Sequence, residues 1–262
     1  MTPLILPLAL SHSASQHLIL LSLEPLTPSL FSDFGTAICP PFTPSLTTPP
    51  RSPASIPVPL HSPHQPAPVF ANRNSALKTS PVSQFTNKYP PSPVSNPQMS
   101  MFSCFPRNLS GIGIEASNSG ESIFKVSILE RHPYTTQTFS PLGLSASDSS
   151  AVFLVVVAPS LPSSTTATTP SGQKTMVVDP PDLSRLRAFL ARGDQAVTYA
   201  PGTWHAPMVV LGQRRVDFLV TQFVNGVAED DCQEVLLGGN NVGVALGGLD
   251  LDGYGNKGRS RL

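Results

Sequence analysis

The sequence predicts a mainly β protein, and three observations carry this prediction. Residues 152–158 form a continuous apolar run rich in valine, which is typical of a strand buried on both faces. Apolar residues alternate over 124–132 and again over 216–223, and this period of two is that of a strand. Shorter apolar runs at 99–105 and 208–211 also read as strands, each bounded by proline or glycine. The face that turns polar at the end of 124–132 suits the mouth of a β-barrel or sandwich.

The elements near the N-terminus are predicted to be short. Thr27 and Pro28 can begin a helical turn as its N-cap and first residue. Phe31 and Phe34 are three residues apart, so they would pack on one side of that turn. Residues 70–88 read as a turn that leads into an early strand.

One helix is predicted, between Asp182 and Gly193. Asp182 is a suitable N-cap, and Leu183, Leu186 and Leu190 fall on one stripe of such a helix. Gly193 follows at the position where helices commonly end in a left-handed residue. A strand over 195–199 is expected next.

The composition is uneven along the 262 residues. Twenty of the 30 prolines but only six charged residues lie in the first 97 positions, so a regular core is expected mainly after that point. Stretches rich in Pro, Ser and Thr bury too little apolar surface to offset the entropy of ordering them. We therefore predict a folded domain over 24–235, a poorly ordered N-terminus over 1–23, disordered low-complexity insertions at 39–69 and 160–178, and a disordered Gly- and Asn-rich tail over 236–262.

Charge and cysteine content narrow the classes of function. The formal net charge is zero and the basic residues are scattered, so no nucleic-acid partner is expected. The apolar stretches 4–10 and 18–23 are too short to cross a bilayer, so no membrane partner is expected. Cys39, Cys104 and Cys232 stand far apart and are odd in number, which favours a reducing compartment, and we predict a cytoplasmic protein.

The residues that could carry chemistry gather at the end of the strand over 124–132. Strand alternation places Glu130 and His132 side by side on one face and Arg131 on the other. His205 is the other histidine in the well-patterned part of the chain, and only tertiary structure can bring it near His132. From pattern alone, a solvated strand end beside Pro133 explains the first pair equally well.

Four stretches, taken together, resemble the ureidoglycolate lyase family. They are Glu130-Arg131-His132-Pro133 with the following Thr136-Gln137-Thr138-Phe139-Ser140-Pro141-Leu142, and residues 26–35, 181–189 and 199–207. The resemblance implies a cupin-like β-barrel, the double-stranded β-helix, and a homodimer. It also implies a carbon–nitrogen lyase of the amidine-lyase type, which cleaves (S)-ureidoglycolate to glyoxylate and urea in allantoin and purine nitrogen catabolism.

The resemblance also suggests roles for particular residues. A base must take the proton of the C2 hydroxyl group, an acid must protonate the leaving urea nitrogen, and a cation must hold the carboxylate. We expect His205 to be the base, with Glu130 or His132 as its orienting partner or as the acid. The residues predicted to bind substrate are Arg131, Lys78 or Arg73 for the carboxylate, and Gln137, Tyr199 and Trp204 around the ureido group and His205.

No cofactor is required by this hypothesis, but a divalent metal could bind. Glu130, His132 and His205 would supply a set of two imidazoles and one carboxylate, which is a common metal-ligand set. The His-x-His pattern of familiar metal-binding cupins does not occur in this sequence. Two alternatives therefore stay open: a metal-dependent cupin acting on another small carboxylate, and a non-catalytic relic disrupted by its insertions.

Overall fold

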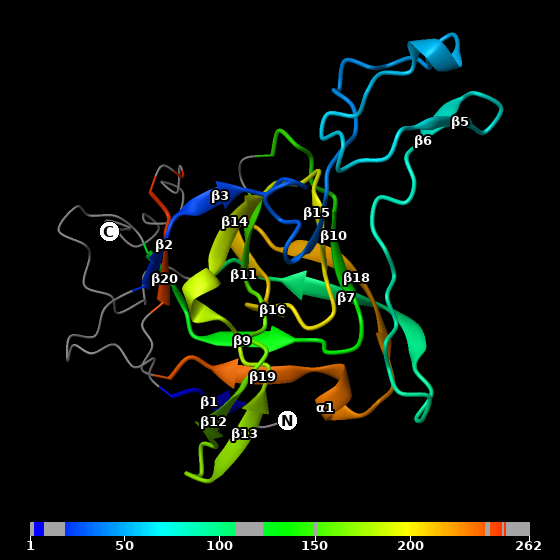
Figure 1. The fold of residues 1–262 in the computed structure, drawn as a ribbon. Helices are drawn as coiled ribbons and strands as arrows, with labels where there is room; N and C mark the ends of the chain where they lie inside the picture. The colour runs from blue at the N-terminus through cyan, green and yellow to red at the C-terminus, as the bar shows by residue number, and fades with distance from the viewer. Residues whose placement is uncertain are drawn as a thin grey trace, which may run out of the picture.

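The computed structural model describes residues 3–7, 19–107, 123–148, 151–238, 242–247 and 249. In these residues nearly all regular structure is strand, and the helices are single short turns, so the predicted mainly β class is confirmed. Figure 1 shows the strands packed together with a long arm on one side. The three helical turns are η1 (Pro53–Ser55), η2 (Leu183–Arg185) and α1 (Ala228–Asp231).

Ten strands form the largest sheet, in the order β13-β12-β1-β19-β9-β16-β11-β14-β3, with β17 also paired to β11. The strand β9 carries the predicted site residues, and it lies between β19 and β16. The bounds are β1 (Leu4–Ile5), β3 (Leu23–Pro25), β9 (Ile128–Arg131), β11 (Ala151–Ala158), β12 (Ser164–Thr168), β13 (Lys174–Val178), β14 (Arg187–Ala191), β16 (Trp204–His205), β17 (Val209–Gly212) and β19 (Gln233–Leu236).

A second sheet of five strands has the order β4-β15-β10-β18-β7. Its strands are β4 (Gly35–Ile38), β7 (Asn96–Cys104), β10 (Gln137–Leu142), β15 (Ala196–Tyr199) and β18 (Val216–Val224). Two smaller sheets complete the fold, one of β2 (Ile19–Leu21), β20 (Val242–Ala245) and β8 (Ile123–Val126), the other of β5 (Val69–Ala71) and β6 (Ala76–Lys78).

The strand β11 is buried on both faces, as its continuous apolar sequence predicts. Phe153, Val155 and Val157 belong to a core that also includes inward side chains of the five-stranded sheet. Leu154 and Val156 belong to a second core on the opposite face of the ten-stranded sheet. Because β11 pairs with β14, β16 and β17, it is the strand around which both cores are built.

The turn predicted at Thr27 is present. The Leu30 amide donates to the Thr27 hydroxyl oxygen at 3.3 Å, and the Phe31 amide donates to the Thr27 carbonyl oxygen at 3.0 Å. Phe31 and Phe34 are both buried, with ring centroids 5.7 Å apart. These two rings close one end of the core between the two large sheets.

The prediction of a helix between Asp182 and Gly193 is wrong. Only the turn η2 forms, with Asp182 as its N-cap, and the chain then continues as strand β14. The leucine spacing predicted a helix, but the segment pairs with the edge of β11 instead. As strand β14 it buries Ala188 in one core and Phe189 in the other. Gly193 does not end a helix, and a Cβ atom there would lie 2.5 Å from that of Leu144.

The alternation predicted over 124–132 is interrupted. The strand breaks at Ser127 into β8 and β9, so Val126 and Leu129 both enter the same core although they are three residues apart. The break restarts the alternation, and Glu130 and His132 still share a side. The prediction of one continuous strand was therefore wrong, but its consequence for these two side chains holds.

Several segments predicted to lack regular structure contain strands. Residues 160–178 include the hairpin β12–β13, which pairs with β1 and is seen at the lower end of Figure 1. The described parts of 1–23 include β1 and β2, and β20 lies within the predicted tail. Residues 250–262 of the predicted tail lie outside the described residues. The predicted limits 23 and 235 therefore do not bound the regular structure.

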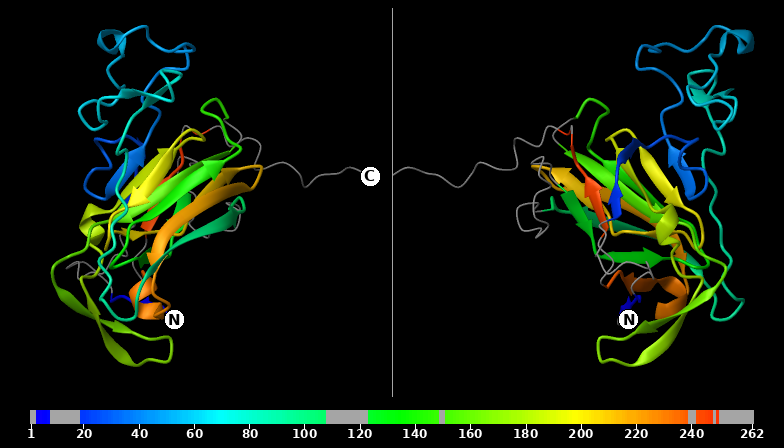
Figure 2. Two further views of the ribbon diagram at one scale, coloured as in Figure 1. Left: turned by 90° about the vertical axis from the view of Figure 1, so that its right-hand side faces the viewer. Right: turned by 60° about the vertical axis from the view of Figure 1, so that its left-hand side comes forward.

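The segment 39–69 differs from the other insertion. Between its first residue and β5 it contains only the turn η1, in agreement with its lack of apolar periodicity. With β5 and β6 it forms the arm that extends away from the large sheets, as Figures 1 and 2 show from three directions. The strands β5 and β6 pair only with each other among the described residues.

Candidate active site

Two neighbouring strands bring Glu130 and His205 together. In the antiparallel pair β9–β16 these residues stand directly opposite each other, and Oε1 of Glu130 lies 3.4 Å from Nε2 of His205. His132 follows β9, so it returns to the same side of the sheet. One potential ligand atom from each of the three side chains lies within 4.8 Å of the others. The structure thus brings together the three residues predicted to be catalytic.

The orientation of the His205 ring is fixed on two sides. Its Nδ1 lies 3.1 Å from the carbonyl oxygen of Thr203, which can only accept a hydrogen bond, so Nδ1 carries a proton. The ring of Tyr199 stacks on it with centroids 3.9 Å apart and planes 12° apart. Nε2 therefore faces the carboxylate of Glu130, and a proton or a cation can bind between the two groups.

His132 is held in the same tautomer. Its Nδ1 donates to the carbonyl oxygen of Asp231 at 2.5 Å, so its Nε2 is a free acceptor. Burial and the nearby charge of His205 lower the pKa of His132 to about 4, although the Asp231 carbonyl, Glu130 and Gln137 act in the opposite direction. His132 is consequently a neutral hydrogen-bond acceptor at neutral pH.

Glu130 is ionised at neutral pH. Burial alone would favour its neutral form, but the adjacent His205 imidazole, together with His132, outweighs burial and lowers the pKa of Glu130. In the described part of the chain no lysine or arginine forms an ion pair with it. The side chain that faces this carboxylate is that of His205, whose Nε2 lies 3.4 Å away.

The buried site has an excess of acceptors. Nε2 of His132, Nε2 of His205 and Oε1 of Gln137 are all buried without a hydrogen-bond partner. The amide nitrogen of Gln137 is used, because it donates to Oε1 of Gln222 at 2.6 Å. Unpaired buried acceptors are rare, because each loses its hydrogen bond to water on folding. This arrangement suits a ligand with several N–H or O–H donors, or a cation.

The same residues fit a divalent metal. Two imidazole Nε2 atoms and a carboxylate are a common ligand set, and both Nδ1 atoms are hydrogen-bonded to backbone carbonyls, as in metal-binding histidines generally. Cys232 and Glu234 lie beside them, with ligand atoms within 4.8 Å of one another and of Glu130. Burial, Glu130 and Glu234 raise the pKa of Cys232 to about 12, so its thiol stays protonated.

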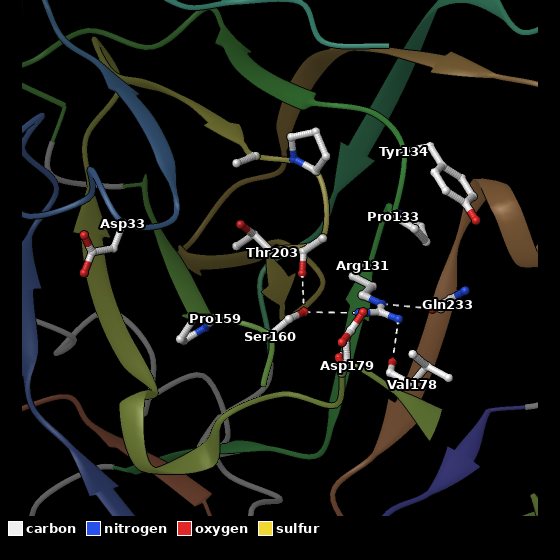
Figure 3. A pocket seen from close by; sticks show the side chains of 13 residues that line it. Asp33, Arg131, Pro133, Tyr134, Pro159, Ser160, Val178, Asp179, Thr203 and Gln233 are labelled. Atoms are coloured by element: carbon white, nitrogen blue, oxygen red, sulfur yellow. Dashed lines mark hydrogen bonds between the residues drawn. The ribbon is translucent and has the colours of Figure 1, made fainter. Parts of the chain in front are cut away.

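Arg131 is not part of this site. Its guanidinium group donates to Oε1 of Gln233 at 2.9 Å, to Oγ of Ser160 at 3.1 Å and to the carbonyl oxygens of Asp179 and Val178, each at 2.8 Å. These hydrogen bonds lie at a pocket of about 680 Å³ whose lining does not include Glu130, His132 or His205. Figure 3 shows Arg131 in this pocket beside Gln233, Ser160, Asp179 and Val178. Arg131 thus anchors the base of the hairpin β12–β13, and its predicted role in holding the substrate carboxylate stays a prediction.

Three further residues of the predicted binding set lie elsewhere. Trp204 is buried in the core on the opposite face, where its Nε1 donates to the Asp179 carbonyl and Arg131 lies 4.7 Å above its ring. Arg73 and Lys78 belong to the β5–β6 arm, away from β9 and β16 in Figure 1. Of the predicted binding residues, Gln137 and Tyr199 are the two that adjoin the histidines.

Sequence reasoning missed Gln222, Cys232 and Glu234. The alternation of β18 would have placed Gln222 on the inward face with Phe218 and Val220, so a signal for it existed. Glu234 stands opposite Glu130 because β19 pairs with β9, and that register is not visible in the sequence. Cys232 precedes β19 and depends on the same pairing.

Among the described residues, no helix is long and apolar enough to cross a membrane. The fold and the site define a mainly β protein with a buried glutamate–dihistidine cluster suited to acid–base or metal-assisted chemistry on a small polar molecule. The family model "Ureidoglycolate lyase" matches residues 18–243, and the chain belongs to this family.

Relatives agree with this assignment. The chain is 35% identical over 165 residues to a ureidoglycolate lyase of Schizosaccharomyces pombe and 40% identical over 169 residues to one of Saccharomyces cerevisiae. Each match covers 63% of this chain and 75% of the relative. A ureidoglycolate lyase of Escherichia coli is 36% identical over 104 residues, which is 40% of this chain and 48% of the relative.

Proposed function

We propose that this protein is a ureidoglycolate lyase that cleaves ureidoglycolate to glyoxylate and urea. The observation that carries the proposal is the buried cluster of Glu130, His132 and His205 in a chain of that family. Ureidoglycolate offers a hydroxyl group and three ureido N–H donors, which match the unpaired acceptors of the site. The family's (S) stereochemistry is part of the proposal.

The reaction moves one proton from oxygen to nitrogen and cleaves the C2–N bond. As the C2 hydroxyl group loses its proton, the electrons of the O–H bond form the carbonyl π bond of glyoxylate while the C2–N bond breaks. The leaving nitrogen then receives that proton from the general base to give urea. In our proposal Nε2 of His205 accepts the hydroxyl proton, and Glu130, 3.4 Å away, stabilises the imidazolium ion that results. His132, which is neutral, accepts a hydrogen bond from the substrate and so orients it.

The test is a product assay on purified protein. Urea and glyoxylate should form in equal amounts without ammonia, and His205→Ala should reduce kcat by about 10²- to 10⁴-fold, the range for one general base. Both cores are expected to keep this variant folded, and its melting temperature is the check. Ammonia in place of urea would overturn the product assignment, and near-normal turnover of folded His205→Ala would overturn the role of this residue.

A metal-dependent reaction is the second candidate, and the free Nε2 atoms favour it. In that case the three residues would hold a divalent cation, which would polarise the substrate oxygen. Loss of activity in chelator and recovery with added metal would support this candidate, whether on ureidoglycolate or on another small carboxylate. Calorimetric titration of the chelator-treated protein with Zn²⁺, Mn²⁺ or Ni²⁺ gives a readout that does not depend on activity.

A non-catalytic relic is not favoured. The segment 160–178, which could have disrupted the fold, is instead paired through β12 to β1. Ala167 and Val177 of that hairpin are buried in the same core as Trp204. A cooperative thermal melt of the purified protein is the expected result.

We infer that two copies associate through the edge strand β7. Its nine residues carry no charge, although edge strands of monomers commonly use charges to prevent pairing. Met99 and Met101 are 75% and 54% exposed, and among the described residues β7 pairs only with β18. Because the strand is uncharged, a second copy meets no like-charge repulsion. Light scattering should give a dimer mass for the natural protein and a monomer mass for Met101→Lys.

A cytoplasmic location belongs to the same proposal. All three cysteines are free, in keeping with a reducing compartment. Localisation of a tagged full-length chain tests it.

A further inference from the structure

A row of one tyrosine and three glutamine side chains crosses four strands of the five-stranded sheet in register. Tyr199 of β15 stands opposite Gln137 of β10, and Gln222 of β18 stands opposite Gln98 of β7. The hydrogen bond of 2.6 Å between Gln137 and Gln222 joins the two halves of the row. The four strands are neighbours in the sheet, and Figure 1 shows them side by side.

The row leads from the histidines to solvent. Tyr199, which stacks on His205, is 2% exposed, and Gln137 is 3% exposed. Gln222 is half-buried and Gln98 is exposed. The side chains share the inward face of the sheet, because Phe102 of β7 contacts Phe139 of β10 and these residues have the same strand parity as the glutamines.

The two inner glutamines leave one acceptor and one donor unused. Gln137 donates through Nε2 to Gln222, but its own Oε1 is buried and without a partner. Nε2 of Gln222 donates to no described residue. A carbonyl oxygen with a neighbouring N–H group is what this pair would bind, since the N–H can donate to Oε1 of Gln137 and the carbonyl can accept from Nε2 of Gln222.

We propose that Gln222, together with Gln137, binds the ureido group of the substrate and selects it against a guanidino group. This inference rests on the proposed lyase function. A ureido group presents both a carbonyl acceptor and N–H donors, whereas a guanidinium ion presents donors only and leaves Nε2 of Gln222 unpaired. The same pair would hold the urea product next to the exposed end of the row.

Product inhibition of the full-length protein tests the proposal. Urea and guanidinium chloride are compared as inhibitors of turnover at millimolar concentrations, where neither denatures. In Gln222→Leu, KM should rise about five- to tenfold with kcat changed by less than about threefold, as expected for loss of one neutral hydrogen bond to the substrate. In Gln222→Glu, inhibition by urea should weaken and inhibition by guanidinium should strengthen, each by about fivefold or more.

A matched variant separates binding from general damage. Gln173→Leu makes the same change at an exposed turn of the β12–β13 hairpin and should leave KM and both inhibition constants unchanged. The melting temperature of each variant shows that it is folded. Unchanged KM and unchanged urea inhibition in folded Gln222→Leu would overturn the role of Gln222. Lack of lyase turnover by the natural protein would instead refute the proposed function itself.

Discussion

The clamp formed by Arg131 predicts that this residue acts on stability and not on substrate binding. The informative substitution is Arg131→Lys, which keeps the positive charge but cannot reproduce four hydrogen bonds directed at Gln233, Ser160, Asp179 and Val178. If Arg131 binds the substrate carboxylate, its replacement should raise KM. If Arg131 is structural, its replacement should lower the free energy of unfolding.

The magnitude follows from the contacts. The lysine side chain has three donors on one nitrogen, so at least one charge-assisted hydrogen bond is lost, which costs about 1.5–3 kcal/mol. Replacing the guanidinium above Trp204 costs about 0.5–1 kcal/mol more. We therefore expect the free energy of unfolding to fall by about 3 kcal/mol. For a chain of this size the melting temperature should fall by about 6–12 °C.

The assay combines urea denaturation with steady-state kinetics below the transition. Arg185→Lys is the matched control, because Arg185 forms an exposed ion pair with Asp33 at 3.2 Å and should change stability by less than about 0.5 kcal/mol. KM of Arg131→Lys should stay within about twofold of the natural value. A KM raised tenfold or more at unchanged stability would refute the structural role and restore carboxylate binding by Arg131.

Three other predictions follow from single residues. In chelator-treated protein the free energy of unfolding should fall as the pH drops from about 6.5 to about 4, because His132 takes up a proton over this range when unfolded but not when folded. His132→Asn should reduce the slope of the free energy of unfolding against pH by up to about 1.4 kcal/mol per pH unit. Cys232, whose pKa is raised to about 12, should resist iodoacetamide at pH 8 and react after unfolding, as followed by mass spectrometry. Gly193→Ala should lower the free energy of unfolding by about 1–3 kcal/mol, because its Cβ atom would overlap Leu144; an unchanged melt would show that the loop yields.

The strands that were predicted correctly are those whose own apolar pattern specifies a strand without reference to the neighbouring strands. β11 was predicted because a strand buried on both faces is apolar at nearly every position. β18 was predicted because a strand buried on one face alternates apolar and polar residues. β14 was mistaken for a helix because Leu183, Leu186 and Leu190 have helical spacing, although the strand contains only Leu190 and forms by pairing with β11. The hairpin β12–β13 was missed because Ser and Thr composition outweighed its weak alternation.

The site shows the same division. Alternation alone put Glu130 and His132 on one side and Arg131 on the other, and the structure agrees. The approach of His205 was expected only through the family resemblance, since 73 residues separate it from His132 in the sequence. The donors of Arg131 could not have been assigned, because Val178 and Asp179 meet it only when the hairpin has folded.

The pairing of the first strands with the last has a consequence for synthesis on the ribosome. Among the described residues β2 pairs only with β20, and β1 pairs with β12 and β19, so the earliest strands find partners encoded far downstream. Translation must pass residue 242 before the sheet that holds β2 can close. The nascent chain therefore carries unpaired apolar strands for most of its elongation, and holding them apart until release is a task for the chaperones of the cell.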